Sequence, residues 1–154
     1  MSTAAAQTKE PDYSGSYICK LKASAGLKVN KDSKAWSGTI FNVTNQSLLM
    51  KVTATGRTGS TQFHPNYPKY GVSFKDFGSA EKANECVNNF NSDKYSKDVP
   101  IIDGRLECQF FGTSYRVNLK TNKVQVYFDG GYMDDDQENT DTPYVAVGVC
   151  DKVS

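Results

Sequence analysis

The sequence predicts an all-β fold: a single antiparallel barrel or sandwich of about eight strands, with one short helix near residues 79–90. Apolar and polar side chains alternate over several segments of strand length, and turn-forming residues separate these segments at regular intervals. An antiparallel sheet of that length has to close or pack in order to hide its edges. The 154 residues include nine Tyr and eight Phe, which is enough apolar surface for one domain with a core.

Residues 1–12 are expected to be a disordered tail, and residues 13–154 a single β domain. In "SYICKLK", Tyr17, Cys19 and Leu21 fall on one face, which is the period-2 pattern of a half-buried strand. The predicted strands cover residues 16–22, 35–43, 47–54, 70–74, 104–111, 114–120, 123–128 and 144–150. The clearest of them form a hairpin in "SYRVNLKTNKVQVYF", where "TN" reverses the chain between two alternating segments.

The pattern changes between Gly78 and Phe90. Ser79 is a suitable N-cap, and apolar residues then recur at three- and four-residue intervals, as an amphipathic helix requires. These residues are Ala80, Ala83, Cys86, Val87 and Phe90. The spacing therefore predicts a short helix over residues 79–90.

Four widely spaced cysteines and a single histidine constrain the chemistry of the chain. Zinc ligands usually come in close pairs, and there is no CxxC pair, so structural zinc is disfavoured. An even number of cysteines in a small polar domain indicates disulfides and a periplasmic or secreted location. Four reduced cysteines in a cytosolic protein are the alternative.

Four cysteines allow three pairings, and the sequence alone does not choose among them. We favour Cys19–Cys150, which would join the first strand to the last. Cys86–Cys108 would then join the predicted helix to the strand that follows it. On the chain-entropy estimate these bonds would contribute about 5 and about 3 kcal/mol, respectively.

The segment "FDGGYMDDDQENTDTP", residues 128–143, contains six carboxylates and no basic residue. Oxygen ligands of this kind suit calcium, and the candidate ligands are Asp134, Asp136, Glu138 and Asp141. The segment lacks the alternating ligands, the sixth-position Gly and the flanking helices of an EF-hand. We therefore interpret it mainly as a solvated loop that balances an otherwise basic chain.

No catalytic constellation emerges, and no catalytic residue or cofactor is predicted. A carboxylate pair of Asp129 or Asp134 with Asp103 or Glu107 would need one desolvated member with a raised pKa, which adjacent solvated aspartates do not provide. His64, the only imidazole, has no GxSxG motif beside it, and paired cysteines leave no free thiol.

Membrane and nucleic-acid partners are also disfavoured. No apolar segment approaches the length of a membrane span. The lysines do not cluster into a run, and the net charge is only +1. We interpret lysines such as Lys20, Lys22, Lys120 and Lys123 as side chains on the outward faces of strands. Aromatic side chains offer apolar area with a polar tip, and the candidate ligand-binding residues are Trp36, Tyr67, Tyr70, Tyr127, Tyr132 and Tyr144.

The C-terminal third resembles the ending of small exported bacterial proteins of unassigned function. The likeness covers roughly residues 112–150 and consists of an "RVNLKT" hairpin, a "GY" loop, an "NTDTP" step and a terminal "GxC". The resemblance implies export to the periplasm and an oxidised Cys150, but no activity. The sequence thus predicts a monomeric, noncatalytic binding or envelope-associated domain for a small molecule, glycan or protein. A calcium-binding or hydrolytic protein that uses residues 129–141 is the alternative.

Overall fold

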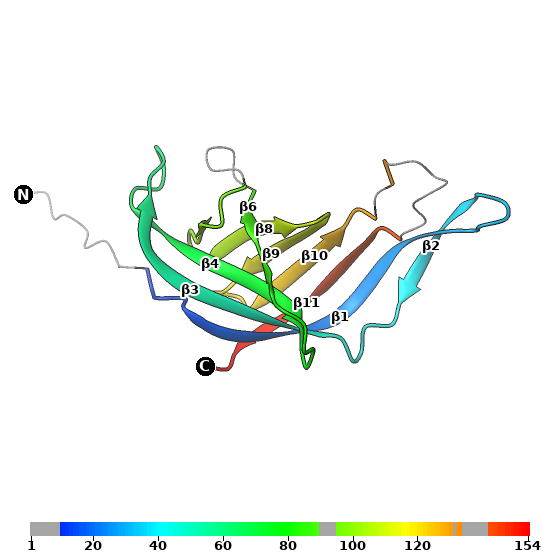
Figure 1. Cartoon of the computed structure of the whole chain (residues 1–154), viewed down its shortest axis with the longest axis horizontal. Coiled ribbons are helices and arrows are strands. Elements are labelled where there is room, and N and C mark those ends of the chain that lie inside the picture. The colour runs from blue at the N-terminus through cyan, green and yellow to red at the C-terminus, as the bar shows by residue number, and fades with distance from the viewer. Residues whose placement is uncertain (1–9, 90–94, 131, 134–141) are drawn as a thin grey trace, which may run out of the picture.

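The computed structural model describes residues 10–89, 95–130, 132–133 and 142–154, and among them it contains eleven β-strands and no helix (Figure 1). The strands are β1 (Gly15–Val29), β2 (Trp36–Phe41), β3 (Ser47–Gly59), β4 (Tyr67–Asp76), β5 (Asn84–Glu85), β6 (Val87–Asn88), β7 (Val99–Pro100), β8 (Arg105–Phe110), β9 (Thr113–Asn118), β10 (Lys123–Phe128) and β11 (Tyr144–Lys152). The described residues thus include no helix long and apolar enough to cross a membrane.

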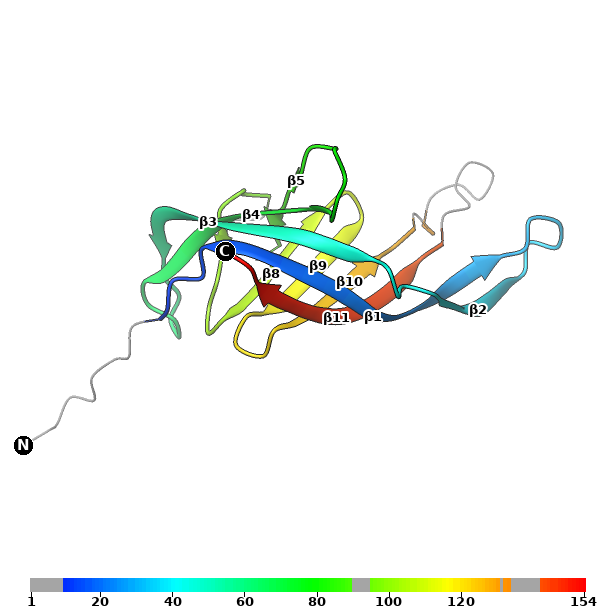
Figure 2. The same cartoon turned by 90° about the horizontal axis from the view of Figure 1, so that it is seen from below.

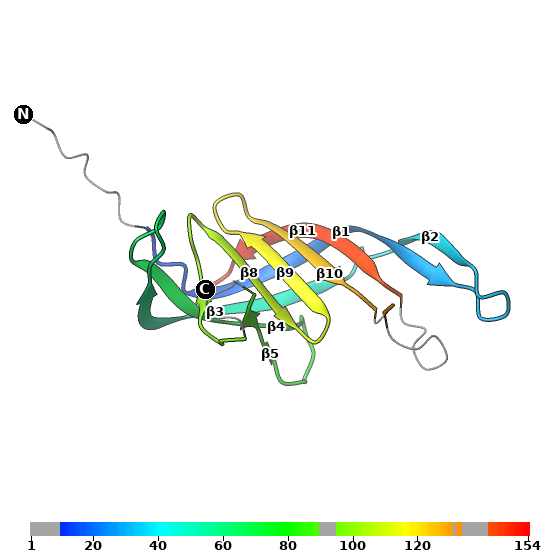
Figure 3. The same ribbon diagram turned by 90° about the horizontal axis from the view of Figure 1, so that it is seen from above.

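All eleven strands belong to one antiparallel sheet, which confirms the all-β prediction. The order of strands is β5-β4-β3-β1-β11-β10-β9-β8-β6, with β2 paired to β1 and β7 paired to β4. The sheet curls into a nearly closed, barrel-like shell, so that β4 and β8 approach each other from its two sides (Figures 1 and 3). Of the two predicted architectures, the barrel is therefore the one that forms.

The seam between β4 and β8 is closed by residues 84–88. Within this segment β5 pairs with β4 and β6 pairs with β8, so five residues connect both edges. Cys86, between the two short strands, donates its backbone N–H to Val72 at 2.8 Å and forms a disulfide with Cys108. The backbone groups that an open sheet would expose are thereby partly satisfied.

The predicted helix over residues 79–90 is wrong, because the part of it that the structure describes, residues 79–89, is irregular or extended. Of its apolar positions, Cys86 is buried, whereas Ala80 is exposed and Ala83 and Val87 are only half-buried. Pairing with two sheet edges and a disulfide outweighs a weak helical periodicity that depends on two alanines. Phe90 lies outside the described residues.

The prediction of about eight strands is too low. The three strands that it missed, β5, β6 and β7, have two residues each and carry no alternating pattern. They form only because β4 and β8 provide edges for them to pair with. Contacts of this kind are absent from local sequence patterns.

The core lies inside the shell, and the inward-facing side chains alternate along the long strands. They include Tyr17, Cys19 and Leu21 from β1, Met50 and Val52 from β3, Tyr70, Val72 and Phe74 from β4, Leu106 and Cys108 from β8, Tyr115 and Val117 from β9, Val124 and Val126 from β10, and Ala146 and Cys150 from β11. Each large apolar side chain buried in this way contributes about 1.5–3 kcal/mol relative to exposure.

Both favoured disulfides are present. Cys19 and Cys150 lie opposite each other in the β1–β11 register, with their Cα atoms 3.9 Å apart, and the Cys86–Cys108 Cα atoms are 5.6 Å apart. No free cysteine remains. Two disulfides are compatible with an oxidising compartment outside the cytosol.

The two ends of the shell differ. The β1–β2 hairpin extends beyond one end, and the β3–β4 turn and the residues before β1 lie at the other end (Figures 1 and 2). The C-terminus lies beside the start of β1, where Val153 donates its backbone N–H to Ser16 at 2.8 Å.

Candidate functional site

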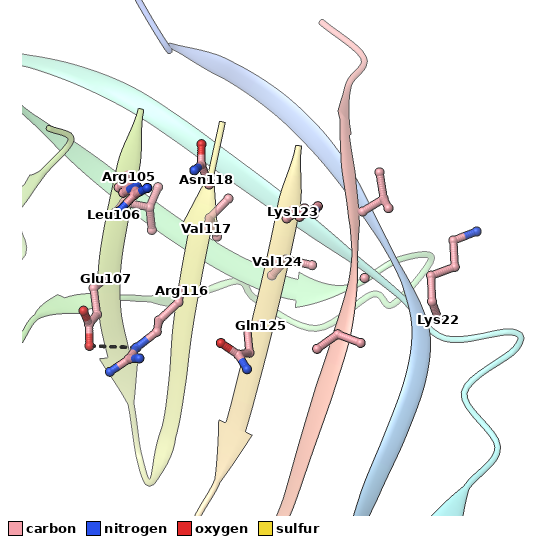
Figure 4. A pocket seen from close by; sticks show the side chains of 13 residues that line it. Lys22, Arg105, Leu106, Glu107, Arg116, Val117, Asn118, Lys123, Val124 and Gln125 are labelled. Atoms are coloured by element: carbon pink, nitrogen blue, oxygen red, sulfur yellow. Dashed lines mark hydrogen bonds and ion pairs between the residues drawn. The ribbon is translucent and has the colours of Figure 1, made fainter. Parts of the chain in front are cut away.

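A groove of about 830 Å³ lies on the outer face of β8–β11, and we call it the sheet groove (Figure 4). Its lining side chains are Lys22, Arg105, Leu106, Glu107, Arg116, Val117, Asn118, Lys123, Val124, Gln125, Val147 and Val149, with Gly148 between the last two. The inward-facing members of this set belong to the core. The outward-facing members are therefore the ones that a ligand would meet.

Cross-strand pairing arranges the outward residues in rows. The first row runs Arg105–Asn118–Lys123–Val149–Lys20 across β8, β9, β10, β11 and β1. Figure 4 shows Arg105, Asn118 and Lys123 on neighbouring strands at this end of the groove. The row thus places a cation on every second strand.

The second row runs Glu107–Arg116–Gln125–Val147. Arg116 donates from Nε to Glu107 at 3.1 Å (Figure 4), and its guanidinium lies 5.6 Å from the ring centroid of Tyr127. Val147 is 43% exposed, so this row also offers an apolar surface. Arg116 is already held by a carboxylate and an aromatic ring, whereas no described carboxylate forms an ion pair with a cation of the first row.

The charge of the sheet groove is strongly unbalanced. Among the described residues, four cations and one carboxylate line it, and that carboxylate, on Glu107, is engaged by Arg116. No described residue forms an ion pair with Lys22, Arg105 or Lys123. Like charges along a concave surface add to one positive potential, which attracts anions.

A β-bulge in β1 determines where the lysines on that strand point. The register between β1 and β11 shifts between Leu21 and Ala23, and the alternation of β1 changes phase there. Gly148 allows the backbones of β1 and β11 to lie close together at the bulge, because a Cβ at that position would lie 2.2 Å from the Lys20 carbonyl oxygen. Bulges commonly redirect side chains in this way. Lys22 belongs to the β1 end of the lining, and Figure 4 shows its ammonium directed away from Arg105, Asn118 and Lys123.

Part of this site can be predicted from the sequence. The alternation in β9 and β10 indicates that Arg116, Asn118 and Lys123 share one face, and lysines in these strands are interpreted as outward. The sequence did not predict the role of Arg105, nor that β8, β9, β10 and β11 lie next to β1 in one sheet. Both depend on the strand order, which brings residues about 100 positions apart into one row.

The six predicted aromatic ligand-binding residues do not form one site. Trp36 and Tyr132 contact each other edge to face, with ring centroids 5.3 Å apart. Tyr144 packs against Phe128 at 5.5 Å and against the core. Tyr127 borders the sheet groove through Arg116.

Tyr67 and Tyr70 lie at the end of the shell that carries the β3–β4 turn. They line a second pocket of about 890 Å³, the end pocket, together with His64 and the carboxylates of Asp12 and Asp103. Tyr70 is buried and accepts a hydrogen bond from the Tyr13 backbone N–H at 3.3 Å. The rest of the lining is mostly apolar and consists of Pro11, Phe63, Pro65, Pro68, Ile101, Ile102, Thr58, Asn66 and Glu10.

The acidic groups of the end pocket do not resemble a catalytic pair. Hydrogen bonds from Ser14 lower the pKa of Asp12, and an ion pair with Lys120 lowers the pKa of Asp103. A general acid requires the opposite shift, since it must hold its proton near neutral pH. Both carboxylates are therefore ionised and already engaged.

The four predicted calcium ligands, Asp134, Asp136, Glu138 and Asp141, lie outside the described residues. Among the residues that are described, no group of three or more His, Cys, Asp or Glu side chains is arranged to hold a metal ion. Asp129, at the start of the acidic segment, is exposed and close to Gly112.

Comparison of the chain with known protein families, with curated proteins and with solved structures finds no match.

Proposed function

We propose that this protein is a noncatalytic binding domain of the periplasm or the extracellular space, and that its ligand is an anion held in the sheet groove. The observation that carries the proposal is the row that places Arg105, Lys123 and Lys20 on alternate strands of one face. An isolated surface lysine needs no explanation. Three aligned cations beside a groove, none in an ion pair with a described carboxylate, favour an external anion. Asp103 acts on Arg105 electrostatically, but it is itself paired with Lys120.

Three further features support ligand binding over the alternative, in which the cations are ordinary charges of a solvated surface. The groove has a volume suitable for a ligand. Asn118 and Gln125 supply amide groups between the cations. Val147 and Val149 keep an apolar surface at the centre of a charged face, which strengthens the interaction of nearby charges with a ligand that displaces water.

The test is a titration with dextran sulfate, a polyanion, and with neutral dextran at low ionic strength. The double variant Arg105→Gln/Lys123→Gln removes two charges from the groove. The matched control Lys28→Gln/Lys31→Gln removes two charges from the exposed β1–β2 hairpin. Both variants have the same net charge, so general attraction affects them equally.

We expect dextran sulfate, but not dextran, to bind the native protein. The groove variant should bind at least tenfold more weakly, and the hairpin variant within twofold of the native protein. Equal losses in the two variants would show that the attraction is general, and the proposal would then be wrong. Thermal melts of both variants check that the fold is retained.

A further inference from the structure

We infer that the ligand of the sheet groove is a linear acidic polysaccharide, lying across the strands in an extended form. Its carboxylates would bind Arg105 and Lys123, which line the groove, and Lys20, which continues their row beyond the groove on β1. This inference rests on the proposed function and names the ligand class of the same site. It follows from the spacing of the cations, from the groups between them, and from the shape of the surface.

The spacing is set by the sheet. Neighbouring strands lie about 4.8 Å apart, so the Cα positions of Arg105 and Lys123, two strands apart, are separated by about 10 Å, and so are those of Lys123 and Lys20. The whole row spans about 19 Å. A regular repeat of positive charge suits a polymer that carries negative charge at regular intervals, and a single small anion would meet only one cation.

The residues between the cations differ in character. Asn118 lies between Arg105 and Lys123, and Val149 lies between Lys123 and Lys20. A sugar ring presents hydroxyl groups at its edge and C–H groups on its face. The amide can bond to hydroxyls and the valine can contact the C–H face, so each unit of an acidic polysaccharide meets a suitable group.

Single-stranded nucleic acid fits this surface less well. Proteins that bind it without sequence preference stack successive bases on aromatic side chains. None of the described residues that line the sheet groove is aromatic. Tyr127, on the same strand as Lys123 and Gln125, has its ring 5.6 Å from the Arg116 guanidinium.

A membrane surface and an extended peptide also fit less well. The site is hollow, and the headgroups of a flat bilayer do not reach the floor of a groove. Peptides that add a strand need a free sheet edge. Most of the groove lies over β9, β10 and β11, which are already paired on both sides, whereas β6 covers the other side of β8 only at Cys108 and Gln109.

The experiment measures binding of oligogalacturonates of increasing length, from the monomer upward, at fixed low ionic strength. Polygalacturonate and its fully methyl-esterified form, polyglutamate, single-stranded oligothymidylate and phosphatidylglycerol vesicles are compared under the same conditions. The variant is Lys123→Gln, at the centre of the row, and the matched control is Lys28→Gln in the hairpin.

We expect the affinity to rise with oligomer length and to level off once the oligomer spans the row. Polygalacturonate should bind at least tenfold more tightly than its methyl ester, polyglutamate, the oligonucleotide or the vesicles. Lys123→Gln should weaken the long oligomers at least fivefold and the monomer less than twofold. Lys28→Gln should change neither.

Affinity that does not depend on length, or tighter binding of any of the other probes, would overturn the polysaccharide inference. The proposed anion site would survive that result, provided that the tightest anionic probe still depends on Arg105 and Lys123. If no anion, including dextran sulfate, binds in a manner that depends on these residues, the proposed function fails as well.

Discussion

Phe74 on β4 and Tyr115 on β9 stack face to face inside the shell, with ring centroids 3.9 Å apart and an interplanar angle of 6°. The two strands are not neighbours in the sheet, so the contact crosses the interior. It lies on the same two sides of the shell that residues 84–88 connect. The shell is thus held near its seam by a disulfide, by short strand pairs and by one aromatic stack.

The buried Tyr115 hydroxyl makes stability depend on alkaline pH. Burial raises the pKa of Tyr115 from 10.0 to about 12, and the neighbouring Tyr144 and Asp76 act in the same direction. Above pH 10 the unfolded chain loses this proton while the folded protein retains it, so the free energy of unfolding falls between pH 10 and about 12. The contribution of this one group is up to about 3 kcal/mol.

Urea unfolding from pH 8 to pH 12 measures this loss. Tyr115→Phe should reduce the slope between pH 10 and 12, although other tyrosines with raised pKa values, such as Tyr13, leave part of it. Tyr127→Phe, at a partly exposed position, serves as the control for the loss of a tyrosine hydroxyl. An equal slope in Tyr115→Phe and in the native protein would contradict the assignment.

The two disulfides should have different effects when removed. On the chain-entropy estimate, Cys19→Ala/Cys150→Ala costs about 5 kcal/mol and Cys86→Ala/Cys108→Ala costs about 3 kcal/mol, because the first bond closes the longer loop. Hydrogen exchange should show the second variant opening chiefly at β5, β6 and β8. Uniformly faster exchange over all strands in that variant would show that the seam is not a separate unit.

Gly148 should be intolerant of a side chain. A Cβ there would lie 2.2 Å from the Lys20 carbonyl oxygen and 3.0 Å from the Leu21 Cα, both backbone atoms that cannot move without breaking the β1–β11 pairing. We expect Gly148→Ala to lower the free energy of unfolding by about 3 kcal/mol. Gly38→Ala in β2, where a Cβ would meet nothing within 4 Å, should change it by less than about 0.5 kcal/mol.

Calcium should not stabilise the protein. The carboxylates of residues 129–141 lack the ligand spacing of a known calcium loop, and a ligand raises the melting temperature only if the folded state binds it. We expect thermal melts with millimolar calcium and with a chelator to coincide. If calcium instead raises the melting temperature of the native protein but not that of Asp134→Asn/Asp136→Asn, the acidic segment is a metal site.

Strand identity could be predicted from the sequence wherever one face of a strand is buried. The alternation of Tyr17, Cys19 and Leu21 predicts β1, and the hairpin pattern predicts β9 and β10, because the side-chain period of a strand is 2 whatever it pairs with. The places of Cys19 and Cys150 in the first and last strands favoured that disulfide, and the Cys86–Cys108 pair was what remained; the structure contains both. The prediction of a helix was wrong because residues 84–88 take their conformation from pairing with β4 and β8, which are distant in the sequence.

Local periodicity is enough to predict the all-β class and the inward faces of the long strands, whereas the cysteine pairs were only a preference among three pairings until the structure placed them. The closure of the shell through residues 84–88, and the single row of Lys20, Lys123 and Arg105, became visible only in the folded sheet. Strand order and register are long-range pairings, and they are fixed by the closure of the whole sheet rather than by any one segment.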